Sequence, residues 1–119
     1  METFCENYRD NVARFGDRLR VKENFDIVEK RLYVGPDEIS VFFVDGFVKD
    51  GELQKLLQYV LSLSAIGNAE NFMMKLPQIE AERTDTPREL AHNVLSGQCA
   101  LFSSSFGAAA ITMDLRTYP

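Results

Sequence analysis

Four consecutive apolar residues, Val41 to Val44, place the tightest limit on the fold of this chain. Such a run lacks the alternation of a strand with one solvent-facing side, so it predicts a buried central strand. The residues from Phe25 to Val34 read as a preceding strand, and Gly35-Pro36-Asp37 between the two has the chemistry of a turn. The pattern therefore predicts an antiparallel hairpin whose second strand lies inside a sheet.

This second strand runs directly into a turn and then into a helix. Asp45 and Gly46 suit a tight turn, and a charged Lys49-Asp50 pair follows. Asp50 suits the N-cap of the next helix, whose first turn also carries Glu52. These residues therefore have structural roles available to them, and they are also the one charged cluster where a strand ends beside a helix start.

Apolar periodicity and local end signals predict the remaining elements. The clearest local signal is Thr86-Pro87-Arg88-Glu89, which reads as a capping box with proline at the first helical position. We expect Leu90, Val94 and Leu95 to form the buried stripe of that helix. The expected helices cover residues 3–20, 51–63, 68–76 and 87 to the stop at Gly97, and the expected strands cover 25–34, 39–44, 79–83, 99–103 and 109–115.

The element order is therefore α-β-β-α-α-β-α-β-β, an α/β fold with a mixed β-sheet and helices packed on it. The length of 119 residues suits a single domain spanning 1–119. The apolar stripe of the first helix either packs against this domain or meets another subunit.

Composition excludes several classes of protein. The net charge is -5, and the basic residues are interleaved with acidic ones, so we expect no nucleic-acid partner. Cys5 and Cys99 lack any CxxC or Cys/His neighbour, which fits two free thiols in a reducing compartment, with Cys99 as a small buried apolar residue. No signal peptide and no apolar run long enough to span a bilayer is present, so we expect a soluble chain in a cytoplasm.

No motif predicts catalysis, a metal or a cofactor. His92 is the one histidine, and the chain contains no serine elbow and no glycine pattern for nucleotides. An enzyme would require His92 to converge with Asp45, Lys49 and Asp50. Because ligands often bind at strand ends in open α/β sheets, that charged cluster remains a candidate ligand site. Ser103-Ser104-Ser105 is expected to satisfy a loop backbone.

Five short segments, in order along the chain, resemble the N-terminal cytosolic region of the GerA/SpoVAF family, the A subunits of spore germinant receptors. The clearest is Phe42-Phe-Val-Asp-Gly-Phe-Val-Lys-Asp50. One departure is Ser103 to Gly107, where the family tends to carry an Asp-Gly turn. The other matching segments are Asn11-Val12 with Phe25-Asp26-Ile27-Val28, Leu76-Pro77-Gln78-Ile79-Glu80, Val94 to Phe102, and Asp114-Leu115-Arg116-Thr117-Tyr118-Pro119.

The resemblance implies the first soluble subdomain of a longer membrane protein, either a receptor A subunit or the related SpoVAF-type member. It implies a non-enzymatic module on the cytoplasmic side of the spore inner membrane, without a cofactor. The implied partners are other receptor subunits and an adjoining second subdomain, with the membrane reached only through a later part of the protein. The expected contact residues are Asp45, Gly46, Lys49, Asp50, Arg116 and Tyr118. The alternatives are direct binding of a small nutrient or a soluble enzyme domain.

Overall fold

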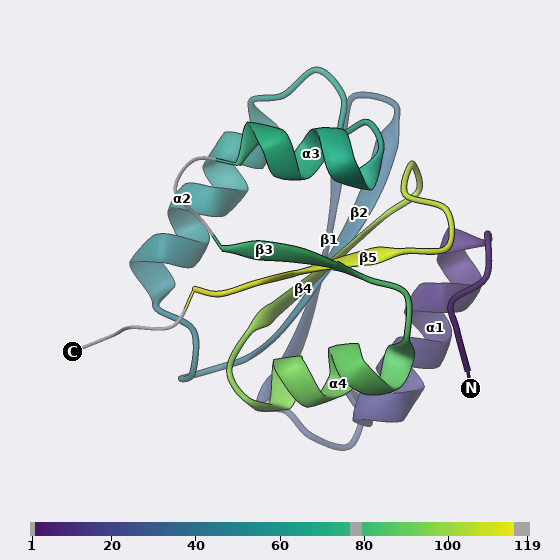
Figure 1. Ribbon diagram of the computed structural model, residues 1–119. Coiled ribbons are helices and arrows are strands. Elements are labelled where there is room, and N and C mark those ends of the chain that lie inside the picture. The colour runs from purple at the N-terminus through teal and green to yellow at the C-terminus, as the bar shows by residue number, and fades with distance from the viewer. Residues whose placement is uncertain (1, 77–79, 116–119) are drawn as a thin grey trace.

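The computed structural model describes residues 2–76 and 80–115 (Figure 1). Its element order is the one that the sequence predicts. The elements are α1 (Tyr8–Leu19), β1 (Ile27–Val34), β2 (Asp37–Val44), α2 (Asp50–Leu61), α3 (Ala69–Lys75), β3 (Ala81–Thr84), α4 (Pro87–Leu95), β4 (Cys99–Ser103) and β5 (Ala110–Met113).

The five strands form one sheet in the order β1-β2-β4-β5-β3, with helices on both faces (Figure 1). The α/β fold class with helices packed on the sheet is thereby confirmed, although the described sheet is antiparallel where the sequence predicts a mixed one. All four strand pairings among the described residues are antiparallel, so the sheet contains no parallel pair there. The run from Val41 to Val44 is buried throughout, because β2 has a neighbouring strand on each side and helices above and below.

Each face of the sheet has its own apolar layer. Phe42 points into the layer beneath α1 and α4, where its ring lies 5.0 Å from that of Phe15 and 5.6 Å from that of Phe102. Its neighbour Phe43 points into the layer beneath α2 and α3, together with Phe72. Adjacent residues of a strand face opposite sides, so β2 contributes an aromatic ring to both layers.

The first helix is shorter than expected. It begins at Tyr8, because the side chain of Asn7 accepts a hydrogen bond from the backbone N–H of Asp10 and caps the helix there. Phe4 precedes the helix and is still buried in the same layer as Phe15. The apolar stripe of α1 packs against the sheet of its own domain, which is one of the two interpretations that the sequence allows.

Three local predictions at helix ends need correction. The N-cap of α2 is Lys49, without a side-chain bond, so Asp50 is the first helical residue and acts through the helix dipole alone. Thr86 does stand at the N-cap of α4, but its hydroxyl donates to the Glu89 carboxylate at 3.4 Å instead of accepting from the backbone. Leu95 is 54% exposed, because it lies about 100° around the helix from the buried Val94.

Strand limits also differ slightly. β1 begins at Ile27, which leaves Phe25 outside the strand. Ile79, where the sequence predicts the start of a strand, lies outside the described residues, and β3 is described from Ala81. Gly35 and Pro36 form the two-residue turn of the β1–β2 hairpin, since Val34 pairs with Asp37.

Helix α1 ends on a non-glycine residue in the left-handed region. Arg20 has φ 55° and ψ 47°, and its ion pair with Glu23 spans 3.9 Å between exposed groups. Arg20→Gly is therefore expected to raise the free energy of unfolding by about 1 kcal/mol, because glycine adopts this conformation without the Cβ penalty. Arg14→Gly, in the exposed middle of the same helix, should lower it by about 1 kcal/mol. Denaturant titration of both variants measures these changes, and a loss of stability in Arg20→Gly would contradict the explanation.

Candidate interaction surface

The predicted turn at Asp45-Gly46 is present and extends the β1–β2 hairpin by one more pair. The backbone N–H of Asp45 donates to the carbonyl oxygen of Asp26 at 2.7 Å. The backbone N–H of Phe47 donates to the carbonyl oxygen of Val44 at 3.2 Å, which closes the turn around Gly46 at φ 91°. Both residues therefore fulfil the structural roles that their chemistry suggests.

The same turn holds the last described residues of the chain. The backbone N–H of Lys49 donates to the carbonyl oxygen of Leu115 at 3.2 Å. Val48 and Leu115 are both buried in the layer beneath α2 and α3. The turn therefore lies beside the point at which the chain reaches Arg116. Arg116 and Tyr118, which the resemblance also singles out, lie outside the described residues.

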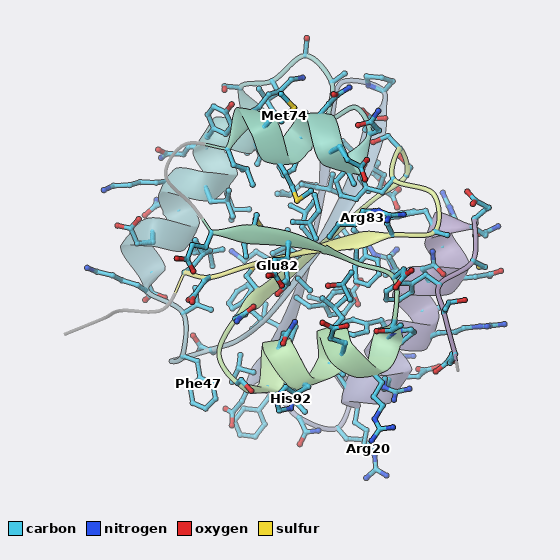
Figure 2. The ribbon with its side chains drawn as sticks, viewed as in Figure 1. Arg20, Phe47, Met74, Glu82, Arg83 and His92 are labelled. Atoms are coloured by element: carbon cyan, nitrogen blue, oxygen red, sulfur yellow. The ribbon has the colours of Figure 1, made fainter. Side chains whose placement is uncertain are left out.

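We call this part of the molecule the exit end, defined by Phe25–Asp26, Asp45–Lys49, Ser96–Gln98 and Asp114–Leu115. Two large apolar side chains are exposed there, Phe25 at 94% and Phe47 at 53%, and Leu95, which is 54% exposed, ends α4 one residue before Ser96. By the β1–β2 register Phe25 falls opposite Gly46. Figure 2 shows Phe47 pointing away from the ribbon at the end where α4 carries His92.

Sequence reasoning missed these exposed apolar side chains, of which Phe25 and Phe47 form what we call the exit patch. Phe25 reads as a strand residue and Leu95 as a buried helix residue, and only the positions of neighbouring elements show that nothing in the described chain covers them. Exposed aromatic side chains that gather on one surface are typical of interaction sites.

A groove of about 390 Å³ lies between the β1–β2 hairpin and α2. Lys30, Asp45, Asp50 and Gln54 supply its polar groups, and the remaining lining residues are the apolar Val28, Phe43, Leu53 and Leu57. The structure thus brings Asp45 and Asp50 together, as the sequence predicts. It adds Lys30 in place of Lys49, which does not line the groove.

The residues required for an acid–base centre do not converge. His92 is exposed on α4, which packs on the face of the sheet opposite to α2 and the groove (Figure 2). In residues 2–76 and 80–115, no group of three or more His, Cys, Asp and Glu side chains could hold a metal ion. A second cleft, of about 340 Å³, is lined by Glu80, Ala81, Glu82, Gln98, Thr112 and Asp114.

The raised pKa values of one buried and one half-buried side chain, Cys99 and Tyr8, have structural explanations. Burial raises the pKa of the Cys99 thiol to about 12, so it stays protonated and behaves as the small apolar residue that the sequence predicts. Burial likewise raises the pKa of Tyr8 to about 12, and its hydroxyl lies 2.6 Å from that of the buried Ser40.

The serine loop is structural, as predicted. The hydroxyl of Ser105 donates to the carbonyl oxygen of Gly67 at 2.6 Å and lies 2.8 Å from the hydroxyl of Ser103. The loop after β4 is thereby attached to the segment that precedes α3.

Among the described residues, no helix is both long enough and apolar enough to cross a bilayer. No family model matches the sequence. No curated protein matches it either. One solved structure is similar over 99% of both chains, with a TM-score of 0.71 and 15% sequence identity: the N-terminal domain of the A subunit of the Bacillus megaterium spore germinant receptor GerK3. The chain therefore has the fold of this receptor domain over 99% of its length.

Proposed function

We propose that this chain is a non-enzymatic module of a spore germinant receptor, which serves in subunit assembly and signal transmission on the cytoplasmic side of the spore inner membrane. The observation that carries the proposal is the end-to-end likeness to an A-subunit N-terminal domain, at a TM-score of 0.71 over 99% of both chains. The five ordered sequence segments support it independently. The partners are other receptor subunits and the adjoining second subdomain of the same protein.

The contact surface in this proposal is the exit end, which includes the exit patch. Asp45, Gly46, Lys49 and Asp50 lie within three residues of Phe47 in the chain, and Arg116 and Tyr118 come one and three residues after Leu115. Aromatic anchors ringed by polar groups supply most of the energy of typical protein interfaces. Because Lys49 bonds to Leu115, a partner joined to the chain beyond Leu115 would lie near the turn that carries Phe47.

The test is the double variant Phe25→Glu/Phe47→Glu, introduced into the full-length protein of the source organism. We expect capture of the other receptor subunits from spore membranes to fall by more than about tenfold, with nutrient-triggered germination falling in parallel. The matched control is Met74→Glu, since Met74 is 84% exposed on α3, away from the exit end (Figure 2).

Both variants should keep the melting temperature of the isolated chain, because the replaced side chains are exposed. Unchanged capture and germination in the double variant would refute the exit patch as the contact surface. An equal loss in Met74→Glu would refute its specificity.

A second candidate function is direct binding of a small nutrient, and the groove favours it. A zwitterionic or polar molecule could place its charged groups against Lys30, Asp45 and Asp50 over the apolar floor. Amide NMR titration of the chain with amino acids, sugars and nucleosides tests this function. Saturable shifts at Asp45 and Asp50 that vanish in Asp50→Asn would establish binding, and unchanged spectra at millimolar concentration would exclude it for this chain.

A further inference from the structure

Strand β1 is the longest open edge of the sheet. It stands at one end of the strand order, pairs with β2 alone among the described residues, and contains neither proline nor glycine from Ile27 to Val34. Along an antiparallel strand, residues whose backbone bonds to the partner strand alternate with residues whose backbone points away. The two-residue turn and the bond from the Asp45 N–H to the Asp26 carbonyl oxygen show which residues of β1 are of each kind. The even-numbered residues of β1 bond to β2, so the backbone groups of Ile27, Glu29, Arg31 and Tyr33 point outward.

These four residues, whose backbone groups point outward, are complementary in charge and apolar character to the same four residues of a second copy. If a second copy of β1 lies antiparallel with Lys30 on the two-fold axis, Glu29 falls opposite Arg31 of that copy, and Ile27 falls opposite Tyr33. On the other face of the strand, Val28 falls opposite Leu32. In each copy Arg31 Nε already lies 2.9 Å from Glu29 Oε2. Pairing would therefore bring Glu29 and Arg31 of both copies together with each charge beside opposite charges. This favours the register over registers in which one strand is shifted along the other.

We propose that β1 is a homotypic docking edge, at which two copies of this chain join their sheets into one. The pairing would also cover Tyr33, which is largely exposed in the single chain. The inference goes beyond the receptor role and does not depend on it, since it rests on the edge geometry and charge pattern alone.

One pair in this register is unfavourable: Lys30 faces its own counterpart. Lysine on an edge strand opposes uncontrolled pairing. Here Lys30 lines the groove together with Asp45 and Asp50, whose carboxylates offset the repulsion. We therefore expect a weak, reversible dimer in place of open-ended aggregation, because the symmetric pairing uses up the edge of both copies.

The first test is sedimentation equilibrium of the chain across a concentration series. We expect a monomer–dimer equilibrium that is weakened about tenfold by Arg31→Glu and by Glu29→Arg, since each turns both cross-strand charge pairs repulsive. An equimolar mixture of the two variants should dimerise again, because opposite charges then meet across the interface. The control is Arg83→Glu on the other edge strand, β3, which should leave the equilibrium unchanged (Figure 2).

The second test uses disulfide crosslinking to determine which residues face each other across the two copies, and it leaves Glu29 unchanged. In this register residue 30 forms a non-hydrogen-bonded pair with its copy, at a Cα separation of about 4.5 Å that a disulfide can bridge. Lys30→Cys, in a Cys5→Ser background with oxidised glutathione, should give a covalent dimer, whereas Arg31→Cys should not. A wild-type chain that stays monomeric at millimolar concentration, a mixture that fails to dimerise, or equal crosslinking at positions 30 and 31 would each overturn the proposal.

Discussion

Replacing Gly35 by alanine is expected to lower the free energy of unfolding by about 3 kcal/mol. Gly35 has φ +58°, and a Cβ built there lies 1.9 Å from the carbonyl oxygen of Ser64. That oxygen belongs to the backbone of the segment after α2, so it cannot move aside as the tip of a flexible side chain could. The left-handed conformation and the collision each contribute about 1–2 kcal/mol.

Gly46→Ala separates these two contributions. Gly46 also has positive φ, +91°, but no atom lies within 4 Å of a Cβ built there. This control should therefore lose only about 1 kcal/mol, the conformational cost alone. Urea unfolding of both variants gives the comparison. Equal losses would mean that the β1–β2 turn moves away from Ser64 at no cost.

Phe102→Ala is expected to remove about 3–5 kcal/mol, a large part of the roughly 5–15 kcal/mol that stabilises a typical domain. Phe102 is 1% exposed and lies among three other aromatic rings, with its centroid 5.3 Å from Phe4, 5.2 Å from Phe15 and 5.6 Å from Phe42. Its removal leaves a cavity that α1, β2 and the N-terminal segment all border.

The control for this truncation is Phe25→Ala. It deletes the same atoms from a ring that is almost wholly exposed, so the change in stability should stay within about 0.5 kcal/mol. Chemical denaturation followed by circular dichroism measures both. If Phe102→Ala lost less than about 1 kcal/mol, the aromatic layer would have to close over the cavity.

Local sequence patterns predict the order of elements because their signals lie within a few residues. The run from Val41 to Val44 identifies a doubly covered strand, and the Asp45-Gly46 turn needs only its own backbone chemistry. The strand order could not be predicted in this way, since β3 crosses to the far edge beside β5 and this depends on packing between distant segments.

The same distinction separates what was found from what was missed at the exit end. Asp45 and Asp50 could be singled out because their charges interrupt an apolar context. Lys30 lies on the neighbouring strand β1 and Phe25 just before it, and the hairpin register brings them to the groove and to the exit patch. Leu95 differs from Val94 by one position around α4, a difference that becomes visible only once the helix lies on the sheet.

The hydrogen bond from the backbone N–H of Lys49 to the carbonyl oxygen of Leu115 connects the start of α2, beside the groove, to the exit end. Lys49 stands one residue before α2, and Leu115 stands at the end of the described chain. A displacement of the polypeptide beyond Leu115 would therefore tilt the first turn of α2, which forms one wall of the groove. Occupancy of the groove and the position of an attached partner would then carry one coupling free energy, equal in both directions.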